Sequence, residues 1–305
     1  MKQQTLRREI RAEGKGLHTG RLVALELLPA AEGYGICFER ADMKGRPVIP
    51  AISSYVTCTQ RNTTLALHGV EVATTEHLMA ALYGMGIDNV HIRVHGPEVP
   101  AMDGSALFFA QMVQKAGIRK QAAARDYYAL KQPLEYENKK TGTVFTLTPA
   151  TEFSLLAEID FSPKTIGRQI FCFNESIDFM QELASARTFV FLDEIIPLLK
   201  KGMIRGGDLD NALVLADGNI SAEDRKWLGT VYNYPVEQRI TGYVNKEGLR
   251  YPNECVRHKT VDLLGDLYLV GRRLKAAVRA YKPGHKANVE VAQMIRTQME
   301  KYAIK

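Results

Sequence analysis

The sequence predicts an α+β protein of two domains, and two observations support this prediction. Short segments with strand-like alternation, bounded by Gly and Pro, are interrupted by a few apolar helical patterns, without the regular alternation of a doubly wound sheet. A chain of 305 residues with an ordinary apolar share also suits two modest domains better than one.

The first part of the chain predicts several strands and two helices. The first helix is expected from about Thr75 to Tyr83. The second is expected to start near Ser105, with Asp103 as a candidate N-cap, and to end before Gly117. Strands are expected at residues 5–10, 21–28, 35–39, 63–67 and 90–95.

A domain boundary is predicted in the stretch 117–125, where three consecutive alanines stand among basic residues before strand-like segments resume at Tyr127. The expected domains are 1–124 and 125–305. The second repeats the first in outline, although no repeat is visible in the sequence itself. Its expected strands are 127–136, 143–147, 154–159 and 169–173, and its expected helices are 177–184, 254–269 and a last one from about residue 285.

Composition and charge exclude several classes of protein. The net charge of +6 comes from basic residues that are spread out and not interleaved with aromatics, so no nucleic-acid partner is expected. The first residues do not resemble a signal peptide, and no apolar run reaches the roughly 20 residues of a membrane span. A monomeric, cytoplasmic protein is expected, with peripheral contact to an acidic membrane surface compatible with its charge.

The four cysteines lie far apart and form no CxxC pair, which argues against disulfides and against a thiolate zinc site. They are expected to be small buried residues.

The segment RHKTVDLLGDLYLVG carries His258, Asp262 and Asp266 at intervals of four residues on an apolar helix. Side chains at positions i and i+4 project side by side, so an imidazole and a carboxylate can reach one zinc ion. Taken alone, the pattern is more often an ordinary solvated helix face, because so short a motif recurs by chance.

The segment TTEHLMAALYGMG places Glu76 and His77 at the start of a helix, followed by the small residues Ala80, Ala81 and Gly84. These small residues are expected to leave room for a metal or a substrate. The alternative is that Glu76 only complements the positive helix N-terminus and that His77 is a hydrogen-bonded core histidine.

Together the two segments offer three ligands, His77, His258 and Asp262, and a free carboxylate beside one of them. A catalytic zinc site needs three protein ligands, an open fourth position and a base. The combination indicates a metal-dependent hydrolase more strongly than either segment does alone.

Further motifs follow in order along nearly the whole chain: GKGLHTG around His18, MDGSA from Met102, SARTF from Ser185 and GHKAN around His285. With the two segments above, they resemble the UDP-3-O-acyl-N-acetylglucosamine deacetylase family, zinc amidases of lipid A synthesis. The resemblance implies two similar α+β domains packed as a sandwich, with the helices between the two sheets. It also implies hydrolysis of the N-acetyl group of UDP-3-O-acyl-N-acetylglucosamine, the committed step of that synthesis.

The resemblance implies one catalytic zinc ion, with Fe²⁺ as the alternative metal. His77, His258 and Asp262 match its ligands in the family, and Glu76 matches the general base. A carboxylate beside the metal suits that role, because it can accept a proton from water during attack on an amide.

The remaining roles are implied in the same way. Thr188 matches a hydroxyl donor to the developing oxyanion, and His285 matches the general acid at the leaving amine. Asp266 resembles the partner that orients His285 and favours its charged form, but the helix N-terminus at His285 has the opposite effect, and the balance is left open. The substrate-binding residues of the family match Lys259, Phe189 and Phe191.

The chain departs from the family pattern at four positions in or near the acyl passage that the resemblance implies. Val190 stands where many members have glycine, and Cys255 replaces the usual phenylalanine before VRHK. Asp208 and Leu209 stand where a small polar residue and an aromatic are familiar. The accepted acyl length is therefore left open.

Residues 221–248, which include Trp227, look like an insertion relative to the family pattern. A surface insertion can be a lid or a contact surface, but a hairpin without a role in function is favoured. Two rival functions remain beside the deacetylase: a zinc hydrolase of another acylated sugar or amide, and a basic binding module without activity. The complete set of ligands, base and acid argues for catalysis.

Overall fold

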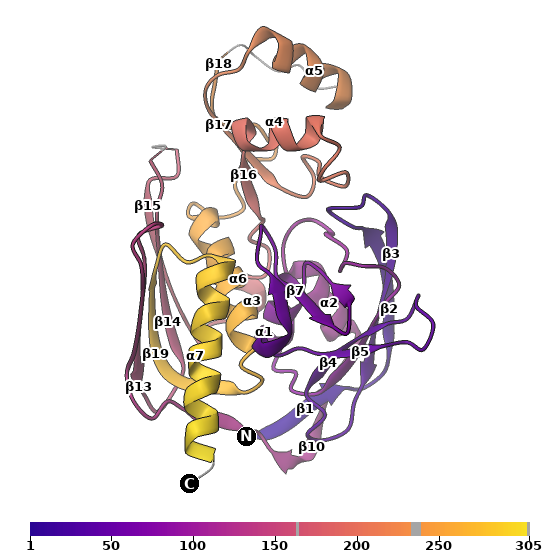
Figure 1. Ribbon diagram of the computed structural model, residues 1–305, viewed down its shortest axis with the longest axis vertical. Coiled ribbons are helices and arrows are strands. Elements are labelled where there is room, and N and C mark those ends of the chain that lie inside the picture. Colours follow the sequence, from indigo (N-terminus) through magenta and orange to yellow (C-terminus); the bar gives the residue numbers. More distant parts are fainter. Residues whose placement is uncertain (163–164, 233–238, 304–305) are drawn as a thin grey trace.

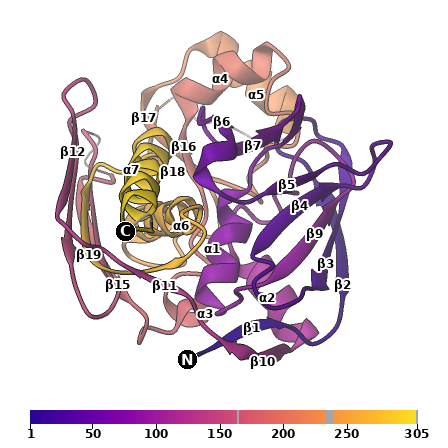
Figure 2. The same cartoon turned by 60° about the horizontal axis from the view of Figure 1, so that its bottom comes forward.

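The computed structural model describes residues 1–162, 165–232 and 239–303 (Figure 1). Two sheets form the outer layers, and the main helices lie between them, as the view in Figure 2 also shows. The α+β sandwich expected from the sequence is confirmed. No helix within these described ranges combines the length and apolar content that crossing a membrane requires.

The first sheet has the strand order β2-β3-β9-β4-β5. All neighbours in it are antiparallel except β4 and β9, which are parallel. Helices α1 (Glu76–Gly84) and α2 (Leu107–Ala116) precede and follow the central strand β9. The strands are β2 (Ile10–Lys15), β3 (Leu22–Pro29), β4 (Ile36–Arg40), β5 (Val48–Pro50) and β9 (Val90–Val94).

The second sheet repeats this arrangement in the order β12-β13-β19-β14-β15, in which β14 and β19 are parallel and the other neighbours are antiparallel, and β11 (Tyr127–Ala129) adds a second parallel pair with β19. Helices α6 (Glu254–Tyr268) and α7 (His285–Ala303) precede and follow the central strand β19. The two halves therefore share one topology, and α1 and α6 are equivalent helices. The strands are β12 (Leu134–Asn138), β13 (Thr143–Pro149), β14 (Ser154–Asp160), β15 (Arg168–Asn174) and β19 (Arg273–Tyr281).

Smaller elements complete the fold. Strands β1 (Lys2–Leu6) and β10 (Ile118–Ala124) form an antiparallel pair. A three-stranded sheet contains β6 (Val56–Cys58), β7 (Thr64–Leu67) and β8 (Val70–Val72), and the short helix η1 (Ser53–Tyr55) precedes it. In the second half of the chain, the short helix α3 (Phe179–Glu182) follows β15. A separate layer at one end of the molecule contains β16 (Phe189–Phe191), α4 (Leu192–Lys200), β17 (Leu213–Asn219), α5 (Ala222–Tyr232) and β18 (Arg239–Tyr243) (Figure 1).

Several predicted elements are wrong in detail. The strand expected at 5–10 is two strands, β1 and β2, because the chain leaves one sheet for another between Leu6 and Ile10. The strand expected at 127–136 is likewise divided into β11 and β12, and the helix expected at 177–184 is only the four residues of α3. The stretch 117–125 contains β10, a paired strand, and the division of the chain after residue 124 stays a prediction.

Helix α2 begins at Leu107, and Asp103 does not cap it. The Asp103 carboxylate instead accepts hydrogen bonds from the backbone N–H and the hydroxyl of Ser105. The cysteines are all free, as expected, but only Cys255 is buried.

Helix α1 is buried along almost its whole length, and α6 crosses it closely. The closest approach is at Gly265, where an added Cβ would lie 2.1 Å from the backbone oxygen of Glu76 and 3.2 Å from the backbone nitrogen of Ala80. Gly84 in turn packs against the ring of Phe179. Ala80 and Gly84 thus serve helix packing, and the expectation that they leave room for a metal or substrate is wrong.

We expect Gly265→Ala to lower the free energy of unfolding by about 1–3 kcal/mol, because the new methyl group collides with backbone that cannot rotate away. Intrinsic helix propensity favours Ala over Gly by about 1 kcal/mol, so an open position would give the opposite sign. Urea unfolding followed by circular dichroism measures the difference. A variant more stable than the parent would show that the two helices are not in tight contact.

Candidate active site

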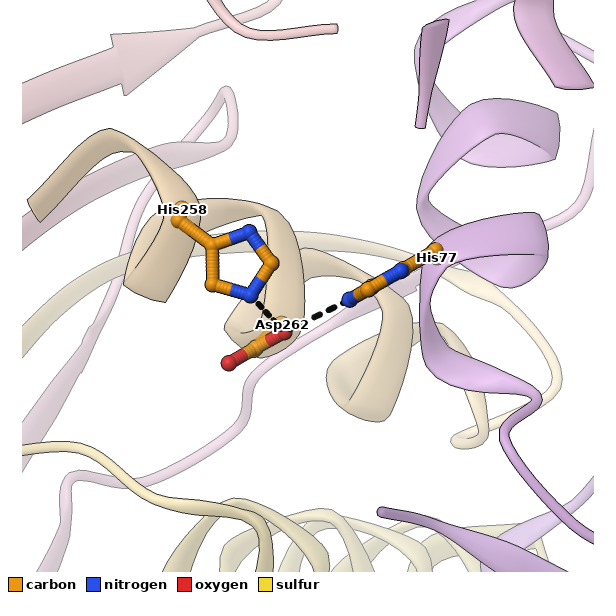
Figure 3. Close-up of side chains that lie close together, drawn as sticks. All are labelled: His77, His258 and Asp262. Carbon is orange, nitrogen blue, oxygen red and sulfur yellow. Dashed lines mark ion pairs between the residues drawn. The ribbon is translucent and has the colours of Figure 1, made fainter. Parts of the chain in front are cut away.

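Three buried side chains converge where α1 meets α6 (Figure 3). His77 lies in the first turn of α1, and His258 and Asp262 lie one turn apart on α6. The Asp262 Oδ1 atom lies 3.4 Å from Nε2 of His77 and 3.2 Å from Nε2 of His258. Atoms suited to bind a metal, one from each residue, all lie within 4.8 Å of one another.

The polar atoms of this cluster fit a divalent metal. Asp262 Oδ1 is buried and has no hydrogen-bond partner. A buried carboxylate oxygen without a partner costs free energy, and a bound cation would offset that cost. The Nδ1 atom of His258 lies 3.1 Å from the carbonyl oxygen of Ala186. A carbonyl can only accept, so Nδ1 is the donor and the lone pair of Nε2 is free for a metal.

The charges around the cluster agree with that fit. Burial lowers the pKa of His258, which favours the neutral form that a metal ligand needs. Burial opposes ionisation of Asp262, but interactions with the neighbouring basic groups, first His258 and then Lys259, outweigh it and hold the pKa of Asp262 well below its usual range. Burial also opposes a charge on His77, yet Asp262 and Glu76 raise its pKa, so His77 favours the protonated form. A metal ion bound here would displace that proton, because only the neutral imidazole is a ligand.

Glu76 precedes His77 and is itself buried, with 3% of its surface exposed. Its Oε2 atom accepts a hydrogen bond of 2.9 Å from the backbone N–H of Thr63. Burial raises the pKa of Glu76, and the charges of His285 and His77 oppose this rise without cancelling it. Glu76 is therefore a carboxyl group with an enhanced affinity for a proton beside the three candidate ligands.

His285, the first residue of α7, faces two carboxylates of α6. Its Nδ1 atom lies 3.0 Å from Oδ2 of Asp266, and its Nε2 atom lies 3.9 Å from Oδ2 of Asp262. Burial alone would lower the pKa of His285, but the charges of Asp266 and Asp262 outweigh it and raise the pKa to about 9. The balance that the sequence left open therefore favours the imidazolium.

Two residues that sequence reasoning missed hold Asp266 in place. The hydroxyl of Thr63 donates to Oδ1 of Asp266 at 2.6 Å, and the amide of Asn288 donates to Oδ2 at 2.9 Å. Thr63 contacts Glu76 as well, so it connects both sides of the site. Asn288 had a signal, since it stands in GHKAN three residues after His285 on one helix, whereas Thr63 had none.

Lys259 and Phe189 also lie at this site. The Lys259 Nζ atom lies 3.0 Å from Oδ2 of Asp262 and 5.5 Å from the ring centroid of Phe189. The Phe189 ring lies 6.4 Å from that of His258. Phe191 packs on Phe161, at 5.8 Å between centroids, and both line a neighbouring pocket on the side of α4.

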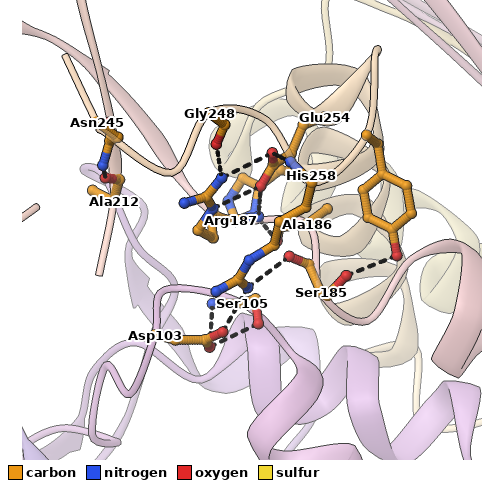
Figure 4. Close-up of polar contacts among 12 residues, drawn as sticks. Asp103, Ser105, Ser185, Ala186, Arg187, Ala212, Asn245, Gly248, Glu254 and His258 are labelled. Carbon is orange, nitrogen blue, oxygen red and sulfur yellow. Dashed lines mark hydrogen bonds and ion pairs between the residues drawn. The ribbon is translucent and has the colours of Figure 1, made fainter. Parts of the chain in front are cut away.

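Polar contacts join the SARTF segment to α6 (Figure 4), and a backbone hydrogen bond joins it to the loop before α2. Arg187 forms a buried ion pair with Glu254, at 2.9 Å between Nε and Oε1. The backbone N–H of Thr188 donates to the carbonyl of Gly104 at 2.8 Å. These contacts fix the backbone on both sides of Thr188 and hold the Ala186 carbonyl against His258.

Thr188 lines an apolar cavity of about 290 Å³. Three of the four positions that depart from the family pattern, Val190, Asp208 and Leu209, line it as well. Cys255, the fourth, is buried in α6, with its Sγ atom 3.6 Å from the hydroxyl of Tyr243. The apolar wall comes mainly from α4 and the loop between α4 and β17, and β16, β17 and α5 contribute one apolar residue each.

Comparisons with known proteins agree with this geometry. A family model described as UDP-3-O-acyl N-acetylglycosamine deacetylase, LpxC, matches residues 3–297. A bifunctional enzyme LpxC/FabZ of Bacteroides thetaiotaomicron is 40% identical over 100% of this chain and 66% of its own length. The bifunctional enzyme LpxC/FabZ of Porphyromonas gingivalis is 39% identical over 98% of this chain and 65% of its own.

The UDP-3-O-acyl-N-acetylglucosamine deacetylase of Myxococcus xanthus is 40% identical over 99% of this chain and 88% of its own length. The chain thus spans slightly less than two thirds of the two bifunctional relatives but most of this one. Because the family model covers almost every residue, the chain belongs to the UDP-3-O-acyl N-acetylglycosamine deacetylase family.

Proposed function

We propose that the protein is a metal-dependent deacetylase that hydrolyses the N-acetyl group of UDP-3-O-acyl-N-acetylglucosamine in lipid A synthesis. The products are acetate and UDP-3-O-acyl-glucosamine. One observation carries the proposal. In a chain of this family, the three candidate metal ligands lie between Glu76, a carboxylate with a raised proton affinity, and His285, a histidine that favours its charged form. A binding module without activity would have no use for that combination.

His77, His258 and Asp262 would hold one divalent ion, which we propose to be zinc, with Fe²⁺ as the alternative. When bound, such an ion polarises the amide carbonyl and makes a water molecule easier to deprotonate. The hydrogen bond from the His258 imidazole to Ala186 orients this ligand, and the low pKa of Asp262 keeps its carboxylate ionised at neutral pH.

Glu76 and His285 move the protons. Glu76 takes a proton from the attacking water, using the oxygen that Thr63 does not bind. As the bond between the carbonyl carbon and the nitrogen breaks, His285 gives its Nε2 proton to the leaving amine. Asp266 holds Nδ1 of the same ring, so Nε2 is the nitrogen that faces Asp262 and the reacting groups.

Thr188 and the residues around it would bind the substrate. We propose that the Thr188 hydroxyl donates to the oxyanion, that Lys259 helps to bind the substrate, and that Phe189 and Phe191 line the passage for its sugar and acyl chain. The apolar cavity beside Thr188 suits the 3-O-acyl chain. We further propose that the protein is monomeric and cytoplasmic and that its two domains divide after residue 124. It has no nucleic-acid partner, and any contact with a membrane is peripheral.

The direct test is acetate release from UDP-3-O-acyl-N-acetylglucosamine by the zinc-loaded protein. We expect Glu76→Gln to lower kcat by about 100-fold or more, the usual range for a positioned base. The amide can still accept the Thr63 hydrogen bond, so the variant tests the proton acceptor and leaves the fold unchanged. Glu152→Gln, at an exposed position, is the matched control. Absence of acetate with the parent protein would reject the function, and full activity in Glu76→Gln would reject the base.

The pH profile tests His285. This group acts in its protonated form, so kcat/KM should be highest below its pKa of about 9 and fall as the pH rises through it. Asp266→Asn removes the charge that favours the imidazolium, and the alkaline limb should move to lower pH. Asp126→Asn, whose partner is the partly exposed Arg272, is the control. An alkaline limb that stays in place in Asp266→Asn would show that another group supplies the acid.

A further inference from the structure

The apolar cavity beside the site is built by a layer with its own small core. The buried members of this core are Leu192, Ile196, Val214, Ala216, Leu228 and Val244. They belong to α4, β17, α5 and the chain after β18, and they form a cluster separate from the main core. Most side chains that line the cavity are aliphatic. Such a surface matches a hydrocarbon chain, because it offers few hydrogen-bond partners to a polar one.

Helix α5 lies in the segment 221–248, which the sequence suggested to be a hairpin without a role. The segment contributes α5 and strand β18, which pairs with β17, and Figure 1 shows α5 beyond α4 at the end of the molecule away from the two outer sheets. Thr188 marks one part of the cavity wall, next to Phe189 and the active site, and Leu228 of α5 marks another. Among the described residues, Leu228 is the one that α5 contributes to this wall.

Specific contacts hold α5 against α4. Ser221 caps the helix, since its hydroxyl accepts from the backbone N–H of Asp224 at 3.0 Å. The Asp224 carboxylate lies 2.7 Å from Nζ of Lys200 on α4, and the same ammonium lies 5.9 Å from the ring centroid of Trp227. Exposed ion pairs add little stability, so burial of Leu228, only 4% exposed, is the main attachment.

We propose that α5 closes the far end of the cavity and that Leu228 sets the length of acyl chain that the protein accepts. The inference rests on the proposed function, because the occupant is the 3-O-acyl chain of that substrate. Each methylene group that the cavity buries should raise kcat/KM by about fourfold, the equivalent of its transfer free energy. A methylene that meets Leu228 should add nothing or reduce the rate, so the dependence on chain length should have a limit.

The test measures kcat/KM for a series of UDP-3-O-acyl-N-acetylglucosamines with acyl chains of increasing length. Leu228→Ala removes three carbon atoms from the wall and should move the limit to chains longer by about two carbons. Leu228→Phe enlarges the same side chain and should move the limit to shorter chains. Val231→Ala, on the same helix but 52% exposed and away from the cavity, should leave the limit unchanged.

A second measurement does not depend on catalysis. The protein is first treated with a metal chelator, and free fatty acids of the same lengths then compete with a fluorescent fatty acid for binding. The longest chain that binds well should become longer in Leu228→Ala and shorter in Leu228→Phe. Equal limits in the parent and both Leu228 variants would overturn the inference while acetate release still supports the proposed function. A shift of both variants in one direction would indicate a loosened α5, and it would overturn the inference too. A parent that binds fatty acids but releases no acetate would reject the proposed function alone.

Discussion

The close crossing of α1 and α6 is the constraint on which the candidate site depends. At Gly265 the two helices approach so closely that a side chain at this position of α6 would collide with the backbone carbonyl of Glu76 on α1. This contact lies between Asp262 and Asp266 on α6 and at the first turn of α1, where Glu76 and His77 stand. Because α1 and α6 are equivalent helices of two halves with one topology, the site lies where the two halves meet.

The polar groups at this crossing form one connected network. Asp262 directs one oxygen at two imidazoles and the other at Lys259, while Asp266 holds His285. Thr63 joins the two sides, since it donates to Glu76 through its backbone and to Asp266 through its hydroxyl. Burial strengthens these interactions and also makes each unpaired group costly. A cation between His77, His258 and Asp262 would satisfy the carboxylate oxygen that has no hydrogen-bond partner.

Local patterns made α1 and α6 predictable, and the spacing of His258 and Asp262 follows from helix geometry alone. Strand β19 was missed, because its alanines, lysine and arginines favour strands only weakly and it is a strand through its pairing with β13 and β14. Thr63 gave no signal either, since it meets Asp266 across 203 residues of sequence. The candidate roles of Thr188 and His285 came from the family resemblance. Neither residue lies on a helix that carries a candidate metal ligand, so no spacing within one element could predict these roles.

The most direct test of the metal site is the metal content of the purified protein after loading with zinc and removal of excess ion. We expect about one equivalent by elemental analysis, since three ligands and one open position make a single tetrahedral site. The double variant His77→Ala, His258→Ala should lose this equivalent while circular dichroism shows an intact fold, and His68→Ala at an exposed position should retain it. Full occupancy in the double variant would show that His77 and His258 do not hold the metal.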